Sequence, residues 1–309
     1  MAQLSNWQCA GPDLDTVLAR YDQPLERLAS GEIPAVVLRG AYSRDACVRL
    51  VDRLIERELL YDPAGPVPAK FLEQSVPEGY FHRTREQPDD PRHHDTGSTP
   101  KRRIDIGTSL GYRGHDQEAF LDHAAETIAL FEHLFDGLDD PIALIYERLN
   151  ALAPDRRVIT AHEPDGRRYG PAIIRAHYGG YTYRPHIDSV RLREQRTEYA
   201  VSAFEHQFAG VLVLQNTECG IGDEIAQGIL HRCLWMPEIN THLEADSFHT
   251  YAAENDIENV RVCLDPGDLY FFNTRLVHEV PGLIGDVPRI VLATFIGYAA
   301  DRDEIFVWS

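Results

Sequence analysis

The segment "YGGYTYRPHID", residues 178–188, contains the most informative pattern of the sequence. It places His186 and Asp188 two residues apart, directly after a segment rich in glycine and tyrosine. In an extended strand, residues i and i+2 point to the same face, so the imidazole and the carboxylate converge on one point. Convergence of this kind is what a metal ion requires, although a His-x-Asp pair taken alone is a weak signal.

A second stretch, "DPGDLYFFNTRLVHEV" (265–280), strengthens that signal. It has a turn at Pro266-Gly267, where Asp268 is expected to serve the turn, and it places His278 at the end of a strand. Two histidines and one carboxylate form a facial triad, which suits Fe(II) and leaves three coordination positions open. Eleven residues after His278, Arg289 opens another strand, and its planar guanidinium suits the remote carboxylate of a 2-oxo acid.

The pattern of apolar residues along the rest of the chain changes near residue 155. Before it, helical spacing of apolar residues predicts helices at 14–28, interrupted by Pro24, and at 43–59, with Ser43 as the N-cap and Val48 on the apolar face. Residues 61–114 show no sustained period and predict a long ordered loop region. After it come short β-rich runs: "FAGVLVLQN", "NVRVCL", "DLYFFNT", "PRIVLATFIGYA" and "EIFVWS". This order predicts an α+β fold with a β-sandwich or barrel core.

At this point the sequence resembles a known superfamily. Residues 172–298 are similar to the double-stranded β-helix core of the iron(II)/2-oxoglutarate-dependent dioxygenases, and "HYGGYTYRPHID" resembles the metal-binding strand of their prolyl-hydroxylase-type branch. The stretches "AVVLRGAYSRD", "HEVPGLIGDVPRI" and "RDEIFVWS" resemble one subgroup, the freestanding welwitindolinone-type indole-alkaloid halogenases. The likeness therefore covers most of the chain.

The resemblance implies a jelly-roll, cupin-like core with a helical N-terminal part packed on it. We expect a single domain over 1–309, with helical support and a loop or lid region in 1–154 and the core in 155–309. By the family pattern, His186, Asp188 and His278 are the iron ligands and Arg289 anchors 2-oxoglutarate. Tyr178 matches a tyrosine that hydrogen-bonds this co-substrate, although a packing role for it stays open. The implied cofactors are Fe(II), 2-oxoglutarate and O2.

One departure from the subgroup concerns the reaction. The halogenases have a glycine where this chain has Asp188, and the missing carboxylate leaves a coordination position for chloride. The resemblance with this departure implies hydroxylation of a small molecule, a specialised metabolite or amino-acid derivative, with release of succinate and CO2. Desaturation or cyclisation at the same iron centre, hydroxylation of a peptidyl substrate and a non-catalytic cupin-like binding role remain alternatives.

Other polar residues stay without an assigned role. Arg175, His177, Tyr181 and Tyr183 flank the ligand strand, and alternation places some of them toward the cavity without fixing which. The cluster at 93–95, His-His-Asp, lies in a polar, turn-rich segment and is interpreted as a solvated loop.

Composition and charge restrict the partners. The net charge of -19 disfavours binding to nucleic acid and to anionic membrane surfaces. Five scattered cysteines without a C-x-x-C pair favour reduced thiols in a cytoplasm. The N-terminus lacks the pattern of a signal peptide, and no apolar run is long enough to span a bilayer. The expected partner is a small-molecule substrate, and the oligomeric state is not fixed by the sequence.

Overall fold

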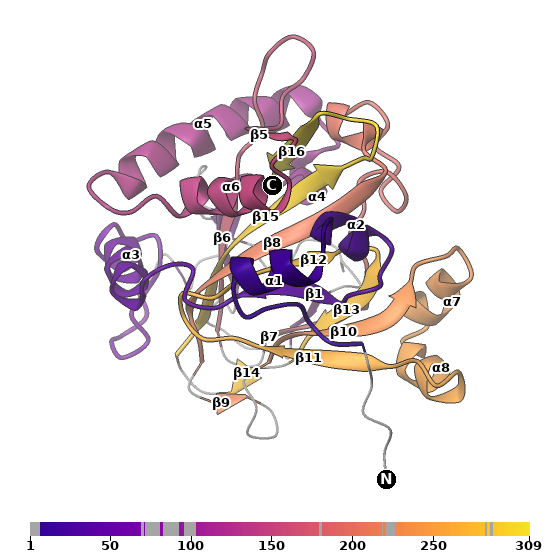
Figure 1. The fold of residues 1–309 in the computed structure, drawn as a ribbon. Coiled ribbons are helices and arrows are strands. Elements are labelled where there is room, and N and C mark those ends of the chain that lie inside the picture. The colour runs from indigo at the N-terminus through magenta and orange to yellow at the C-terminus, as the bar shows by residue number, and fades with distance from the viewer. Residues whose placement is uncertain are drawn as a thin grey trace.

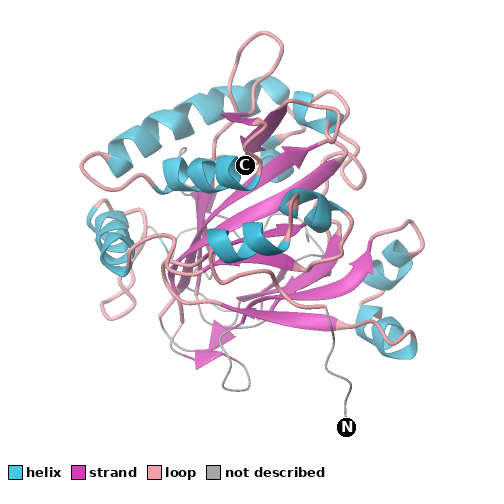
Figure 2. Cartoon of the chain, viewed as in Figure 1, coloured by secondary structure: helices cyan, strands magenta, loops and turns pink. Residues whose placement is uncertain are grey.

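Two β-sheets form the centre of the molecule, and helices lie around them (Figure 1, Figure 2). The computed structural model describes residues 7–68, 71, 81–82, 93–95, 103–178, 181–217, 219–220, 226–281, 283–284 and 287–309. Within these residues no helix is long and apolar enough to cross a membrane.

The larger sheet has the strand order β1-β12-β8-β15-β6-β4-β2, and β16 pairs with β15 and, in parallel, with β5. All its other pairings are antiparallel. Its strands are β1 (Ala35–Leu38), β2 (Phe81–His82), β4 (Arg103–Ile106), β5 (Arg157–Thr160), β6 (Ile173–His177), β8 (His206–Gln215), β12 (Leu269–Asn273), β15 (Arg289–Tyr298) and β16 (Glu304–Trp308).

The smaller sheet is antiparallel and faces the larger one. Its order is β11-β10-β13-β7-β3. Leu230 of the smaller sheet packs in one apolar cluster with Val211 and Val291 of the larger sheet. The strands are β3 (His93–Asp95), β7 (Tyr181–His186), β10 (Ala226–Leu234), β11 (Asn259–Cys263) and β13 (Leu276–Val280), and a separate ribbon pairs β9 (Cys219–Gly220) with β14 (Leu283–Ile284). This arrangement is the predicted jelly-roll core in an α+β fold.

Helices cover the outer face of the larger sheet. Buried side chains of α3, α5 and α6 pack in one cluster with outward-facing residues of β4, β6, β8, β12 and β15. In Figure 1, α5 and α6 lie beside β15 and β16, whereas α7 and α8 lie at the end of β10 and β11. The helices are α1 (Leu14–Arg20), α2 (Pro24–Ala29), α3 (Arg44–Glu56), α4 (Leu110–Arg113), α5 (Gln117–Phe135), α6 (Pro141–Leu152), α7 (Ile239–Glu244) and α8 (Phe248–Glu254), with a 3-10 turn at Ala200–Ala203.

Local sequence signals explain where these helices begin. The side chain of Ser43 accepts a hydrogen bond from the backbone N–H of Ala46, as predicted for the N-cap of α3. The expected apolar face of α3 is wrong in one residue, because Val48 is 58% exposed. The buried face instead includes Cys47, Leu50 and Leu54, which follow the i, i+3, i+7 spacing of a packed helix.

The segment 61–114 departs from the loop prediction where it is described. It contains β4, which extends the larger sheet beside β6, and α4. Residues 93–95 pair with β7 as strand β3 instead of forming a loop. Much of the expected loop falls outside the described residues. Since β1 and β4 both join the larger sheet, the strands of the core are not confined to 155–309.

A buried carboxylate fixes the turn before β12. Asp268 is 4% exposed, and its carboxylate accepts hydrogen bonds from the backbone N–H groups of Gly40 (2.8 Å) and Asp265 (2.9 Å). Arg39 donates a third bond to it (2.6 Å). The expected turn role of Asp268 is confirmed, and the same carboxylate also ties the end of β1 to this turn.

We therefore expect Asp268→Ala to lower the free energy of unfolding by about 2–3 kcal/mol, because it removes three hydrogen bonds to a buried charged acceptor. Urea unfolding followed by circular dichroism measures the loss. The control is Asp265→Ala, which removes only an exposed pair with Arg44 (3.7 Å) and should cost less than about 1 kcal/mol. Equal losses in the two variants would contradict this role of Asp268.

Candidate active site

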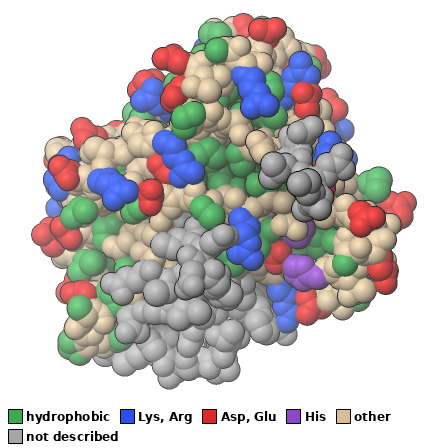
Figure 3. Space-filling model, turned by 60° about the horizontal axis from the view of Figure 1, so that its bottom comes forward, with side chains coloured by type: hydrophobic (Ala, Val, Ile, Leu, Met, Phe, Trp, Pro, Cys, Tyr) green, Lys and Arg blue, Asp and Glu red, His purple; other side chains and the backbone are tan. Residues whose placement is uncertain are grey.

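A cavity lies between the two sheets, lined by residues of β6, β8, β12 and β15 on one side and of β7, β10 and β13 on the other. It holds about 970 Å³ of space, counting the part open to solvent. Much of the wall is apolar, including Ile173, Val211, Leu230, Phe272 and Val291. Figure 3 shows a face of the molecule on which hydrophobic side chains gather in a hollow with charged side chains around it.

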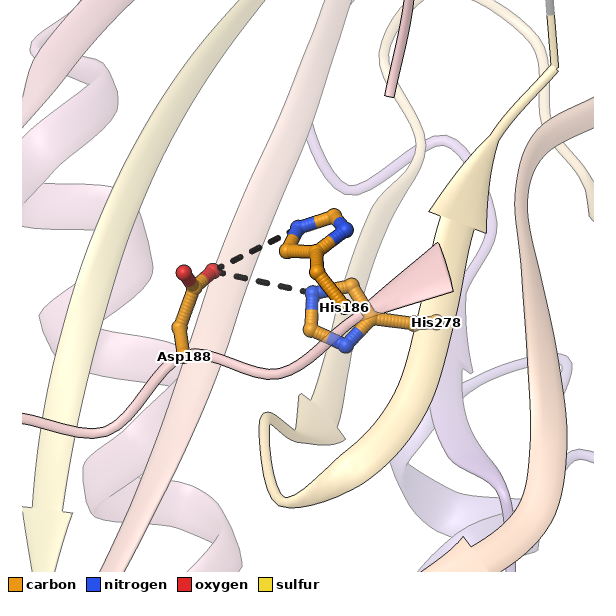
Figure 4. A group of neighbouring side chains, drawn as sticks. All are labelled: His186, Asp188 and His278. Atoms are coloured by element: carbon orange, nitrogen blue, oxygen red, sulfur yellow. Dashed lines mark ion pairs between the residues drawn. The ribbon is translucent and has the colours of Figure 1, made fainter. Parts of the chain in front are cut away.

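Three of the predicted ligands meet at this cavity. His278 of β13 lies directly opposite His186 at the end of β7, because the two strands pair in that register. The carboxylate of Asp188 lies 3.6 Å from Nε2 of His278 and 3.9 Å from Nε2 of His186 (Figure 4). Strand β7 ends at His186, so Asp188 follows the strand instead of continuing it. Backbone bonds to Thr274 hold it in place: the N–H of Asp188 donates to the carbonyl of Thr274 (3.1 Å).

The two imidazoles present the correct nitrogen for a metal. Nδ1 of His186 lies 2.7 Å from the carbonyl oxygen of Arg184, and Nδ1 of His278 lies 2.8 Å from that of Leu276. A carbonyl oxygen only accepts, so each Nδ1 carries the proton and each Nε2 has a lone pair to offer. Two atoms that each lie about 2.1 Å from one ion are at most about 4.2 Å apart, so the observed distances fit a shared ion. These residues therefore fit an iron(II) site.

A second cluster, His231, His249 and Glu279, fits a metal less well. Nε2 of His231 lies 2.9 Å from Glu279, which is a hydrogen-bond distance. Nδ1 of His231 is buried and has no hydrogen-bond partner in the part of the chain that the structure describes. The proton therefore lies on Nε2, where it blocks coordination, and His249 is largely exposed. This cluster therefore holds Glu279 at the cavity wall, and it fits a metal ion less well than His186, Asp188 and His278 do.

Arg289 lies in the cavity wall as the first residue of β15. Its Nη1 lies 3.0 Å from Nδ1 of His177, the residue opposite it on β6. Burial, together with the charges of Arg289, Arg103 and Arg175, holds the pKa of His177 well below its ordinary value. His177 is therefore neutral, and its Nδ1 can accept a hydrogen bond from the guanidinium. The pairing orients Arg289 without neutralising its charge.

Tyr178 does not join this group. Its hydroxyl donates to the carbonyl oxygen of Tyr61 (3.2 Å), and its ring stacks on that of Tyr61 at 4.2 Å. It belongs to the apolar cluster beneath the helices, and it is not among the residues that line the cavity. Alternation along β6 explains this, because Arg175 and His177 face the cavity and Tyr178 has the opposite phase. The placement favours the packing role and does not support contact with the co-substrate.

The structure resolves which flanking residues face inward and adds others. Arg175, His177 and Tyr183 line the cavity, whereas the side chain of Tyr181 lies outside the described residues. Tyr112 and Glu194 line it too, and sequence reasoning missed both. Behind this wall lies the buried pair Arg103–Asp105. The i, i+2 spacing in "RRIDI" was the available signal for a strand with both charges on one face.

The chain is similar to known proteins in sequence and in fold. A family model described as "Carrier-protein-independent halogenase WelO5" matches residues 13–309. No curated protein sequence matches the chain significantly. Among solved structures, an N-substituted L-amino acid dioxygenase from Burkholderia ambifaria AMMD in complex with alpha-KG has a TM-score of 0.53, with 13% identity over 92% of this chain and 90% of that one.

Two further solved structures show a weaker likeness. The epimerase SnoN in complex with Fe3+, alpha ketoglutarate and nogalamycin RO has a TM-score of 0.43, with 14% identity over 91% of this chain and 89% of that one. HygX from Streptomyces hygroscopicus, with nickel and 2-oxoglutarate bound, has a TM-score of 0.42, with 11% identity over 90% and 88%. At such identities the first structure establishes the likeness of fold alone.

The site geometry predicts which substitutions weaken metal binding. His186→Ala and His278→Ala should each weaken Fe(II) binding by more than about 100-fold, since changes outside the ligand set alone cost about 10- to 100-fold. Anaerobic calorimetry measures the affinity, and circular dichroism checks the fold. His249→Ala serves as the control and should leave Fe(II) affinity unchanged. Loss of Fe(II) in His249→Ala with retention in His186→Ala would assign the metal to the other cluster.

Proposed function

The chain belongs to the WelO5 family of carrier-protein-independent halogenases, within the iron(II)/2-oxoglutarate-dependent oxygenases, and we propose that it is a hydroxylase of a small molecule. The superfamily uses the cofactors predicted from the sequence: Fe(II), 2-oxoglutarate and O2. In the proposed reaction, one oxygen atom of O2 enters a C–H bond of the substrate, while 2-oxoglutarate yields succinate and CO2.

The observation that carries the proposal is the convergence of His186, Asp188 and His278 at a largely apolar cavity that Arg289 also lines. Iron bound there supplies the activation of O2. The protein supplies the positions: two imidazoles in the correct tautomer and one carboxylate form the ligand set. Arg289 offers a fixed guanidinium fork for the remote carboxylate of 2-oxoglutarate.

Asp188 favours oxygenation over halogenation within this family. The halogenases that the chain resembles lack a carboxylate at this position. Three protein ligands leave three positions for small molecules, and the co-substrate and O2 need all of them. No position is left for a halide ion, so the substrate receives oxygen.

The form of the cavity supports a small-molecule substrate. The space lies between the two sheets and is lined mainly by apolar side chains with a few polar groups, as sites for small ligands are. Apolar side chains on both walls exclude water and contact a hydrocarbon skeleton. Desaturation and cyclisation begin at the same ligand set, and product analysis separates them from hydroxylation.

The co-substrate role of Arg289 predicts a selective defect. Arg289→Leu should raise the 2-oxoglutarate concentration needed for succinate formation by at least about 30-fold, because it removes one partner of a buried charge pair. The substrate requirement should change far less. Arg232→Leu is the control, since Arg232 makes only an exposed pair with Glu258 (2.7 Å). If only the substrate constant moved in Arg289→Leu, Arg289 would have to be assigned to the substrate.

The ligand role of Asp188 predicts the product. In chloride-rich buffer, wild-type turnover of a substrate that stimulates succinate formation should give an oxygenated product without a chlorinated one. Mass spectrometry of the products measures this. Asp188→Gly opens the position and should weaken or abolish oxygenation while allowing chloride to bind. A dominant chlorinated product from the wild type would refute the hydroxylase proposal.

A further inference from the structure

The charged side chains around the cavity leave one positive charge unmatched. Among the described residues, Arg175, Asp188, Glu194, Glu279 and Arg289 line the cavity. Glu194 lies 3.0 Å from Arg196, and Glu279 lies between two histidines. Under the proposed function, Asp188 faces the metal and Arg289 faces 2-oxoglutarate. Arg175 remains.

The nearest carboxylate to Arg175 is already engaged. Asp105 lies 3.9 Å from Nε of Arg175, the single ion-pair contact of Arg175 among the described residues. Arg103 contacts both oxygens of that carboxylate, with Nε at 2.8 Å and Nη2 at 2.6 Å. Nε of Arg175 is buried and has no hydrogen-bond acceptor within the described part of the chain. One carboxylate thus serves two guanidinium groups.

Among the described residues, the single carboxylate of Asp105 offsets the charges of both Arg103 and Arg175. Tyr183 and Asp105 raise the pKa of Arg175 against the effect of its burial, but burial raises the pKa of Tyr183 as well, so this hydroxyl stays neutral near pH 7. A charge removed from water costs free energy unless a partner compensates it, and Arg103 adds repulsion. The adjacent imidazole gives no compensation, because burial and the neighbouring arginines keep His177 neutral. An arrangement of this kind persists where a ligand supplies the missing negative charge.

The position of Arg175 separates it from Arg289. On β6, Arg175 lies opposite Asp105 of β4 and Val291 of β15, whereas His177 lies opposite Arg289. Two residues along a strand correspond to about 7 Å. Of the electrostatic neighbours of Arg175, Arg103 and Asp105 lie on β4, Tyr183 lies on β7 and Tyr112 lies on α4. Arg175 and Arg289 therefore start from different positions on the cavity wall, although their charges still interact.

We propose that Arg175 binds a carboxylate of the substrate, so that the substrate is a small organic acid with an aliphatic or aromatic skeleton. This rests on the proposed function, which assigns the other charges. A carboxylate matches the single unbalanced charge and the planar fork of the guanidinium. A phosphate monoester brings close to two negative charges and exceeds the charge available. Ile173 and Val291 beside Arg175 provide the apolar contacts that a skeleton of this kind needs.

The first experiment measures stability without any ligand. Arg175→Met should leave the melting temperature of the metal-free protein unchanged or raise it by a few degrees, because it removes an uncompensated charge. Arg103→Met is the matched control on the neighbouring strand and should lower the melting temperature, since it removes both close contacts that Arg103 makes with the carboxylate of Asp105. A clear fall in Arg175→Met, equal to that in Arg103→Met, would show that Arg175 is a structural partner of Asp105 and overturn the proposal.

The second experiment measures binding to protein loaded anaerobically with Fe(II) and 2-oxoglutarate. The probes are phenylacetate and hexanoate, each compared with its own primary amide, and phenyl phosphate. In calorimetry the wild type should bind each acid at least about tenfold tighter than the amide, the scale of one charge-assisted contact. Arg175→Met should lose this preference while its 2-oxoglutarate affinity changes less than about twofold, and Arg175→Lys should retain part of it.

The contrary outcomes are distinct. No preference for acid over amide in the wild type overturns the substrate assignment, while wild-type binding of Fe(II) and 2-oxoglutarate leaves the proposed function standing. A large loss of 2-oxoglutarate affinity in Arg175→Met assigns Arg175 to the co-substrate. Tighter binding of phenyl phosphate than of both acids overturns the carboxylate class. Failure of the wild type to bind 2-oxoglutarate refutes the proposed function itself.

Discussion

The pairing of β7 with β13 is the constraint on which the site depends. It sets His186 directly opposite His278, so two residues 92 positions apart in sequence present their imidazoles side by side. The carbonyl groups of the same strands fix both tautomers, and Thr274, just before β13, fixes the backbone of Asp188. A change of register by one residue would turn one imidazole to the other face of the sheet. The backbone therefore sets the positions of the proposed metal ligands.

The larger sheet has a different role on each face. Toward the helices, Ile174, Ala176 and Tyr178 pack in an apolar cluster, which supplies the hydrophobic stabilisation. Toward the cavity, the intervening Arg175 and His177 carry polar and charged groups that the fold does not need for packing. Apolar packing thus fills the outer face and part of the space between the sheets, and the polar part of the inner face is left to bind ligands. The uncompensated charge at Arg175 is tolerable because the outer face does not depend on it.

Prediction from sequence succeeded where spacing and order in the chain suffice. His186 and Asp188 share a short segment, and His278 and Arg289 follow turn signals, so their meeting could be inferred without knowing the pairing. The face of the sheet on which Tyr178 lies could not be inferred, because the phase of β6 is set by its long-range pairing with β15. Arg103 and Asp105 were missed for a related reason: β4 lies in a segment without sustained periodicity and is held by β6. Which strands pair depends on tertiary contacts that no local pattern records.

The backbone at Asp188 can accept either of the two residues that the proposed hydroxylase and the halogenases have at this position. Two hydrogen bonds with Thr274 hold the main chain of Asp188. The N–H of Asp188 donates to the carbonyl oxygen of Thr274, and the carbonyl oxygen of Asp188 accepts from the hydroxyl of Thr274 (2.7 Å). Its φ is not in the left-handed region, so neither glycine nor aspartate is required by the backbone. The backbone therefore accepts either side chain at this position. Exchange of aspartate for glycine would change the set of possible metal ligands with little effect on the strands. Under the proposed function, a single carboxylate therefore separates this chain from the halogenases that it resembles.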